Sequence, residues 1–296
     1  MIGPGAVERR FHRWCLAPTL TVLAAVTVLP TLYLLATSLT PLNLTQPQTA
    51  WDFSRPLRNY ELLVADARLR ASLWVQLKLS FWTVGLQMIL GFLFALLLNS
   101  RSRFLEALRT VFLIPMVLPP IVVAIIWKVL YTPDISPAHW ALAALGRPMP
   151  ALITHPAYAL AAIIVADVWE WFPFTMLMIL AGLQLVPQEL VDAARIDGAG
   201  AWRLTRHIIL PLLRGVLLVA ALFRLIDSIK AFPLIFILTD GGPGAVTEVT
   251  NYYSYVQAFN FSYLGYSSAI TVALVLATVA LSALVLRAIG WGPRSE

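Results

Sequence analysis

Long apolar stretches dominate this sequence of 296 residues, and each is long enough to cross a lipid bilayer as a helix. About 20 apolar residues span the hydrocarbon core, where a helix satisfies all of its own backbone polar groups. With 59% hydrophobic and only 12% charged residues, an ordinary soluble domain is excluded. The predicted spans are roughly 16–39, 73–98, 111–131, 158–183, 212–238 and 268–289. The sequence therefore predicts an all-α membrane protein with six transmembrane helices.

The first apolar run is longer than the apolar region of a signal peptide, so we expect it to be a retained helix. Prolines should disturb the third span, because Pro115, Pro119 and Pro120 all lie within it. A proline removes a helix hydrogen bond, and neighbouring helices in a membrane can satisfy the freed carbonyl. We therefore expect the segment 111–131 to be kinked or interrupted.

Arginines indicate the orientation, because basic residues gather on the cytoplasmic side of a membrane. They are concentrated in the N-terminal segment, the loop 99–110, the stretch 187–211 and the C-terminal segment. The loop 132–157 has a single arginine and the loop 239–267 has none, whereas the loop 40–72 is an exception with four. This pattern predicts a multi-pass protein with both termini in the cytoplasm.

The stretch 187–211 differs from everything around it, because charged and small residues alternate in it. Pro187 suits the first turn of a helix, and Gly198 suits its end, where a residue often takes a positive φ. We expect a second short helix near Gly200, and Pro211 should begin the next span. The segment is predicted to be a helix–turn–helix elbow that docks on another surface. An ordinary amphipathic cytoplasmic loop is equally compatible with the residues alone.

Charged residues also lie inside two predicted spans. Ionisable groups there are costly and should face the bundle interior or a water-filled cavity. Together with aromatic rings on the same helical face, they suit a hydroxylated ligand; a cluster of ion pairs that only holds helices together is the alternative. The candidate residues of a substrate path are Asp167, Glu170, Trp171, Phe174, Arg224, Asp227 and Lys230.

The sequence also excludes several classes of site. Its three lysines, Lys78, Lys128 and Lys230, do not follow a glycine, so no phosphate-binding loop of an ATPase is present. The four histidines are scattered, and we predict no catalytic residue, no metal site and no cofactor on this chain. Cys15 is the single cysteine, so no internal disulfide can form. The basic residues that give the net charge of +6 lie at the ends of apolar segments, so this charge does not imply binding to nucleic acid.

The elbow resembles the EAA loop of binding-protein-dependent ABC importer permeases. The matching residues are Asp192-Ala193-Ala194, Asp197-Gly198-Ala199 and Ile208-Ile209-Leu210-Pro211, with Asp192 where the family usually has Glu and Thr205 where many relatives have an aromatic residue. The resemblance implies a type I ABC importer transmembrane fold, in which this loop sits in a cleft of the ATP-binding subunit. It implies a coupling role for Asp192, Ala193, Ala194, Asp197, Gly198, Ala199, Leu210 and Pro211.

Other segments resemble the carbohydrate subfamily, which includes the maltose-transporter-type and glycerol-phosphate-type permease subunits. The stretch 238–244, Thr247-Glu248, 257–260 and 264–269 looks like the last external loop of that subfamily, with Asp240 as a departure. Asn59-Tyr60 is similar to the segment that precedes the core domain in sugar permeases. We therefore expect a domain of residues 1–70, with the first helix and external loop, and an importer core of residues 71–290.

The resemblance implies an inner (plasma) membrane permease subunit that carries a sugar, polyol or related carbohydrate and has no enzymatic activity. Its expected partners are a second homologous permease, two ATP-binding subunits that hold ATP and Mg, an extracytoplasmic substrate-binding protein or lipoprotein, and membrane lipid, but no nucleic acid. A sugar-phosphate or glycerol-phosphate substrate is an alternative within this class. A stand-alone secondary transporter, with Asp167 or Glu170 as its proton site, is the alternative from another class.

Overall fold

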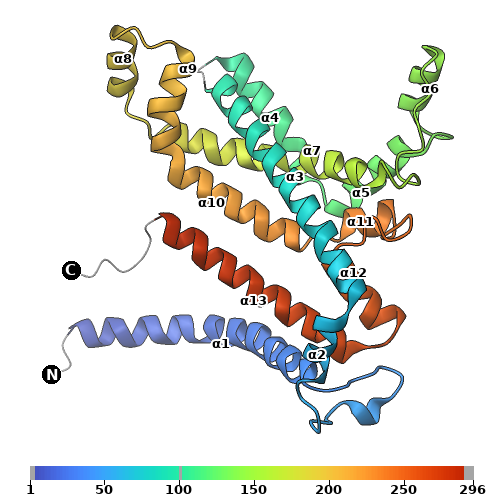
Figure 1. Ribbon diagram of the computed structural model, residues 1–296. Coiled ribbons are helices and arrows are strands. Elements are labelled where there is room, and N and C mark those ends of the chain that lie inside the picture. The colour runs from blue at the N-terminus through green and yellow to red at the C-terminus, as the bar shows by residue number, and fades with distance from the viewer. Residues whose placement is uncertain (1–3, 100–101, 290–296) are drawn as a thin grey trace. The chain divides into compact units, whose positions relative to one another are not determined.

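The computed structural model describes residues 4–99 and 102–289; Arg101, residue 290 and Arg294 lie outside them. Within the described residues, regular structure is helical apart from an isolated bridge between Asn43 and Gln46 (Figure 1). The chain forms two compact units. The N-terminal unit holds Met1–Asp66 and Ser254–Ala273, and the core unit holds Ala67–Tyr253 and Leu274–Glu296. The boundary expected at residue 70 stays a prediction.

The N-terminal unit contains the first long helix and the loop that follows it. Its elements are α1 (Pro4–Ser38), η1 (Pro47–Thr49), α2 (Arg58–Ala65), η3 (Val256–Asn260) and the first part of α13 (Leu264–Ile289). Asn59 Nδ2 donates hydrogen bonds to the carbonyls of Ser38, at 2.9 Å, and Thr40, at 2.8 Å. Because carbonyls at a helix C-terminus lack partners within the helix, Asn59 stabilises the end of α1.

Segments at least 200 residues apart in sequence also meet in this unit. The Gly265 N–H donates to the carbonyl of Leu42 at 2.9 Å, and the Tyr266 hydroxyl donates to Asp66 Oδ2 at 2.5 Å. A Cβ atom on Gly265 would collide with the carbonyl of Thr40, so only glycine fits this approach. The two sequence patterns that resemble sugar permeases, around Asn59 and Gly265, therefore both pack against the segment 38–42.

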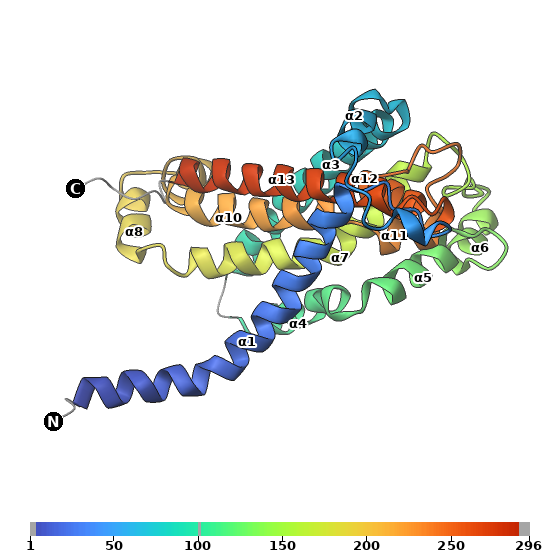
Figure 2. The same cartoon turned by 90° about the horizontal axis from the view of Figure 1, so that it is seen from below.

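The core unit is built around three long helices, α3 (Ala67–Leu98), α7 (Ala159–Leu183) and α10 (Leu210–Ile229), which pack on one another. Figures 1 and 2 both show α7 beside α10. A Cβ atom on Gly91 of α3 would collide with the side chain of Thr175 on α7, so the two backbones approach closely there. The Thr175 hydroxyl lies 2.8 Å from the carbonyl of Gln87 and joins the same helices.

The third predicted span is interrupted, as its prolines indicated. It consists of α4 (Arg103–Val117) and α5 (Pro120–Tyr131), with a bend of 95° between them. Leu118 and Pro119 both precede a proline and take extended conformations, which end α4. Pro120 then begins α5, where its missing N–H costs nothing. The described residues hold five helices long and apolar enough to cross a membrane, or six if the bent pair counts as one span.

The prediction of one continuous fifth span to residue 238 was wrong. The helix α10 ends at Ile229, and a separate short helix, α11 (Pro233–Leu238), follows. Phe232 precedes Pro233 and leaves the helical conformation, with φ −144°, because the proline ring disfavours helix at the preceding residue. Lys230 consequently lies just beyond the end of α10 rather than inside a span. The remaining short helices are α6 (Pro137–Ala144), α8 (Gln188–Ile196), α9 (Ala201–Leu204) and α12 (Thr250–Tyr255).

Candidate functional site

The elbow begins with α8, which ends in a hydrogen-bonded glycine turn. Gly198 has φ +78°, its N–H donates to the carbonyl of Arg195 at 3.0 Å, and the Ala199 N–H donates to the carbonyl of Ala194 at 2.9 Å. These two bonds satisfy the last carbonyls of the helix, and the positive φ favours glycine. The turn predicted at Gly198 is therefore present.

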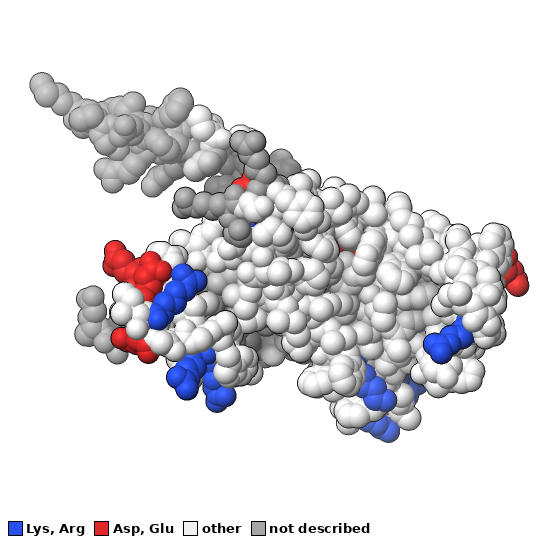
Figure 3. Space-filling model, turned by 90° about the horizontal axis from the view of Figure 1, so that it is seen from above, with Lys and Arg blue, Asp and Glu red and all other residues white. Residues whose placement is uncertain are grey.

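Helix α8 is held to the core by one face only. Val191 is its buried residue, and it belongs to an apolar cluster with Leu183, Leu204, Ile209 and Leu213. Most of the residues predicted to couple are accessible: Asp192, Ala193, Asp197, Gly198 and Pro211 are exposed, whereas Ala194, Ala199 and Leu210 are half-buried, and Ala194 packs against the same cluster as Val191. Figure 3 shows acidic and basic side chains gathered at this end of the visible face, next to a broad uncharged surface.

Two apolar side chains of the elbow were missed by sequence reasoning. Ile196 is 87% exposed and Trp202 is 69% exposed, although both are large and hydrophobic. The carboxylate of Asp192, by contrast, has local partners in Gln188 and Arg195 of the same helix. The surface that the elbow presents thus combines apolar side chains with charges that are partly neutralised. The sequence feature that could have indicated both residues was their position beside the glycine turn.

The second helix of the elbow is not separate from the next span, which corrects the prediction for Pro211. Residues Ala201 to Ile229 form one continuous helical segment that passes through a wide turn, η2 (Thr205–Ile209). The Leu210 N–H bonds the carbonyl of Thr205, five residues back. Pro211 has no N–H to donate, so the wider turn takes place before it. The second helix of the elbow and the charged residues of α10 therefore belong to one continuous helical segment.

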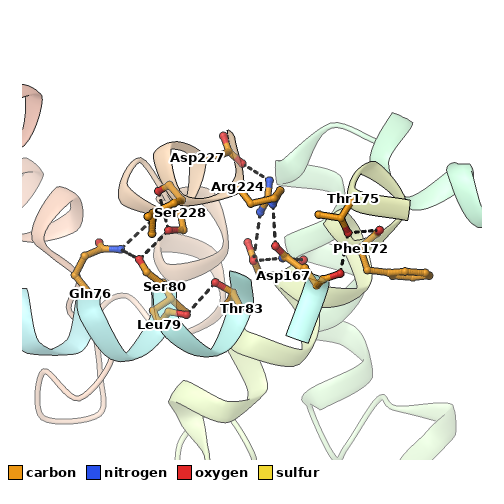
Figure 4. A network of polar contacts seen from close by, with 12 residues as sticks. Gln76, Leu79, Ser80, Thr83, Asp167, Phe172, Thr175, Arg224, Asp227 and Ser228 are labelled. Atoms are coloured by element: carbon orange, nitrogen blue, oxygen red, sulfur yellow. Dashed lines mark hydrogen bonds and ion pairs between the residues drawn. The ribbon is translucent and has the colours of Figure 1, made fainter. Parts of the chain in front are cut away.

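Arg224 is the centre of the charged cluster and is only 2% exposed. Its Nε donates to Gln87 Oε1 at 2.8 Å, and its Nη1 donates to Asp227 Oδ2 at 2.7 Å. The Nη2 atom lies 3.6 Å from Asp167 Oδ2, and the guanidinium lies 4.6 Å from the ring centre of Trp171. Figure 4 shows Arg224 between Asp227 on one side and Asp167 on the other. These contacts compensate the burial of its charge.

Gln87 on α3 is a member of this cluster that sequence reasoning missed. Its Nε2 donates to Asp167 Oδ2 at 2.8 Å while its Oε1 accepts from Arg224, so one amide joins all three long helices. A second polar contact between α3 and α10 lies close by: Gln76 donates to the carbonyl of Ser228 at 2.9 Å, and Ser80 accepts from the Ser228 hydroxyl at 2.7 Å (Figure 4). The sequence feature that could have indicated these contacts was the presence of two glutamines, Gln76 and Gln87, inside an apolar span.

A pocket of about 100 Å³ lies beside the cluster in the core unit. The predicted path residues Asp167, Glu170, Trp171, Asp227 and Lys230 all line it, and so do Pro120, Ala231, Phe232, Pro233 and Leu234. The break between α10 and α11 thus supplies much of its wall. Carboxylates, an ammonium group and an indole ring in one pocket can bind a hydroxylated molecule reversibly through hydrogen bonds and ring contact.

Two predicted path residues have other positions. Phe174 is not among the residues that line the pocket; its ring packs edge-on against Phe223, with centroids 6.3 Å apart. Arg224 contacts the lining residues rather than lining the pocket itself. In the part of the chain that the structure describes, no group of three or more His, Cys, Asp or Glu residues is placed to hold a metal ion.

Comparison with known proteins shows the family of this chain. Residues 87–291 match the family described as binding-protein-dependent transport system inner membrane component. The trehalose/maltose transport system permease protein MalF of Thermococcus litoralis is 40% identical over 209 residues, which cover 71% of this chain and 70% of that protein. The trehalose transport system permease protein SugA of Mycobacterium tuberculosis is 33% identical over 285 residues, 96% of this chain and 89% of that protein.

The fold is also similar to that of a solved bacterial ABC transporter involved in the import of the acidic polysaccharide alginate. The TM-score is 0.81 with 17% sequence identity, and the match covers 97% of this chain and 99% of that one. At this identity the likeness concerns the fold. With most of the sequence inside the family match and the same helical fold in the solved transporter, the chain belongs to the family of inner membrane components of binding-protein-dependent transport systems.

Proposed function

We propose that this chain is the permease subunit of an ATP-driven importer for a sugar, polyol or related carbohydrate. The observation that carries the proposal is the pocket in the helical core, where Asp167, Glu170, Trp171, Asp227 and Lys230 come together. Sugars need hydrogen-bond partners for their hydroxyl groups and a flat ring for their CH faces. The names of the relatives MalF and SugA, which refer to trehalose and maltose, support the same class of substrate.

A neutral carbohydrate fits this pocket better than a sugar-phosphate. Three of the charged lining residues are carboxylates, Asp167, Glu170 and Asp227, and a phosphate would meet their repulsion. Arg224, the strongest candidate for a phosphate, already donates to Gln87 and Asp227. Lys230 is then the single cation of the pocket wall among the described residues.

The proposed assembly contains a second homologous permease, two ATP-binding subunits with ATP and Mg, and an extracytoplasmic substrate-binding protein or lipoprotein, surrounded by membrane lipid. The elbow supports the contact with an ATP-binding subunit, because its exposed Ile196 and Trp202 are apolar and its second helix continues into α10. Movement of the elbow would thereby reach the helix that carries Arg224. In this arrangement both termini are cytoplasmic and the chain itself hydrolyses no ATP.

A stand-alone secondary transporter would need a carboxylate that is free to exchange a proton during transport. Asp167 does not suit this role, because Gln87 and Arg224 both hold it. Glu170 has no such partners, so the experiment must separate the two classes directly.

The test is uptake by liposomes that contain the chain with its partner permease, the ATP-binding subunit and the loaded binding protein. We expect ATP inside the liposomes to drive uptake of at least one neutral compound from a panel of trehalose, maltose, xylose and glycerol. Glycerol 3-phosphate serves as the anionic comparison. Uptake of the phosphate ester alone would contradict a neutral substrate, and uptake driven by a proton gradient without ATP would contradict the importer.

A further inference from the structure

The carboxylates of the pocket differ in how they are held, and this difference separates their roles. Asp167 accepts from Gln87 and lies 3.6 Å from Arg224, and Asp227 accepts from Arg224 at 2.7 Å. Glu170, one turn along α7 from Asp167, is 1% exposed. Its Oε1 atom is buried and has no hydrogen-bond partner, and no ion pair reaches it among residues 4–99 and 102–289.

A buried carboxyl oxygen without a hydrogen-bond partner is costly in a membrane helix, because the group has lost its hydration. The same side chain lines the pocket. A hydroxyl group that enters the pocket can donate a hydrogen bond to Glu170 and so supply the partner that its buried Oε1 atom lacks. The two aspartates, by contrast, already hold Arg224 in place.

We propose that Glu170 is the residue that recognises substrate in the pocket, by accepting a hydrogen bond from a hydroxyl of the neutral carbohydrate. Asp167 and Asp227 act through Arg224 and keep the pocket wall in place. Lys230, which forms no ion pair with any described residue and lines the same pocket, can donate to a neighbouring substrate oxygen. This inference rests on the proposed carbohydrate substrate and names the residue that selects it.

Stability distinguishes this role from a structural one. If Glu170 held helices together, its replacement would destabilise the protein, as expected for a buried ion-pair member. Because it has no partner, Glu170→Gln and the apolar Glu170→Met should unfold at or above the temperature of the wild type. Asp167→Asn, at a held carboxylate of the same pocket, should unfold below it. Glu106→Gln is the control for the chemical change, because Glu106 is exposed on α4 and distant in sequence from the pocket residues.

The decisive measurement combines these variants with altered substrates in the complete liposome system, at saturating binding protein. The probe is the neutral compound of the panel that the wild type imports best, together with its monodeoxy analogues. We expect uptake per ATP hydrolysed to fall about fivefold in Glu170→Met, which loses the hydrogen bond, and to fall less in Glu170→Gln, whose amide oxygen can still accept one. For one deoxy analogue, uptake by the wild type and by Glu170→Met should be equal, which identifies the hydroxyl that donates to Glu170.

Three results would overturn the inference. They are unchanged uptake in both Glu170 variants, an equal loss for every deoxy analogue, and lost assembly of Glu170→Gln, which would assign the carboxylate to a contact with another subunit. A wild-type complex that imports no member of the panel would instead overturn the proposed carbohydrate function. The two failures are therefore distinguishable by the wild type alone.

Discussion

Replacement of Arg224 by methionine tests whether the charged cluster is held as the structure shows. Arg224→Met keeps a long side chain but removes the cation that faces Asp167 and Asp227. Breaking a buried ion pair from one side costs about 3–5 kcal/mol, because the other charge stays buried and unpaired. The loss should lie near the lower end, about 3 kcal/mol, since Gln87 still donates to Asp167 and the side chain of Asp227 is 47% exposed.

A second substitution makes the argument quantitative. In Arg224→Met/Asp167→Asn no buried charge is left unpaired at this point, and the asparagine can still accept from Gln87. The double variant should therefore recover about 2 kcal/mol relative to Arg224→Met. Asp167→Asn alone should cost only about 1 kcal/mol, because Arg224 keeps its closer partner Asp227.

The assay is denaturant unfolding of the purified protein in detergent micelles, followed for the wild type, both single variants and the double variant. The four free energies of unfolding give the interaction energy of Arg224 with Asp167. An Arg224→Met protein as stable as the wild type would refute the reasoning. So would a double variant that is less stable than Arg224→Met by the full cost of Asp167→Asn, because the two side chains would then be independent.

Three further predictions concern the elbow, the orientation and the substrate path. Gly198→Ser should lower substrate-stimulated ATP hydrolysis of the complex, since a side chain at φ +78° costs roughly 1–2 kcal/mol. The control Gly200→Ser, at φ −71° with equally open space, should not lower it, and equal effects of the two variants would argue against the turn. In a Cys15→Ser background, Gly200→Cys should resist an impermeant thiol reagent added outside and the exposed Leu145→Cys should react, and the reverse pattern would invert the orientation. Asp227→Asn should assemble with a loss of at most about 1 kcal/mol, because Arg224 keeps Asp167 and Gln87, and it should lower uptake less than Glu170→Met; an equal fall would place Asp227 in direct contact with the substrate.

The sequence was most informative where one local rule decides the structure. The glycine turn at Gly198 follows from the need for a positive φ, and the break near Pro119 follows from the effect of a proline on the residue before it. The end of α10 obeys the same rule through Pro233, although the apolar run past residue 229 suggested an unbroken span. The wide turn before Pro211 was also missed, because a helix can absorb a proline by lengthening a turn.

By itself, the sequence determined the helical class, the membrane location of the spans and the position of the elbow, because apolar length and turn chemistry are local properties of the chain. It also named the charged residues that line the pocket, since charges are conspicuous in apolar helices. Only the tertiary structure decided which of them are paired. Gln87 joins Asp167 and Arg224 across three helices, while Glu170, one turn from Asp167, has no described donor. Such pairing depends on which side chains face one another across packed helices, rather than on the spacing of residues along any one helix.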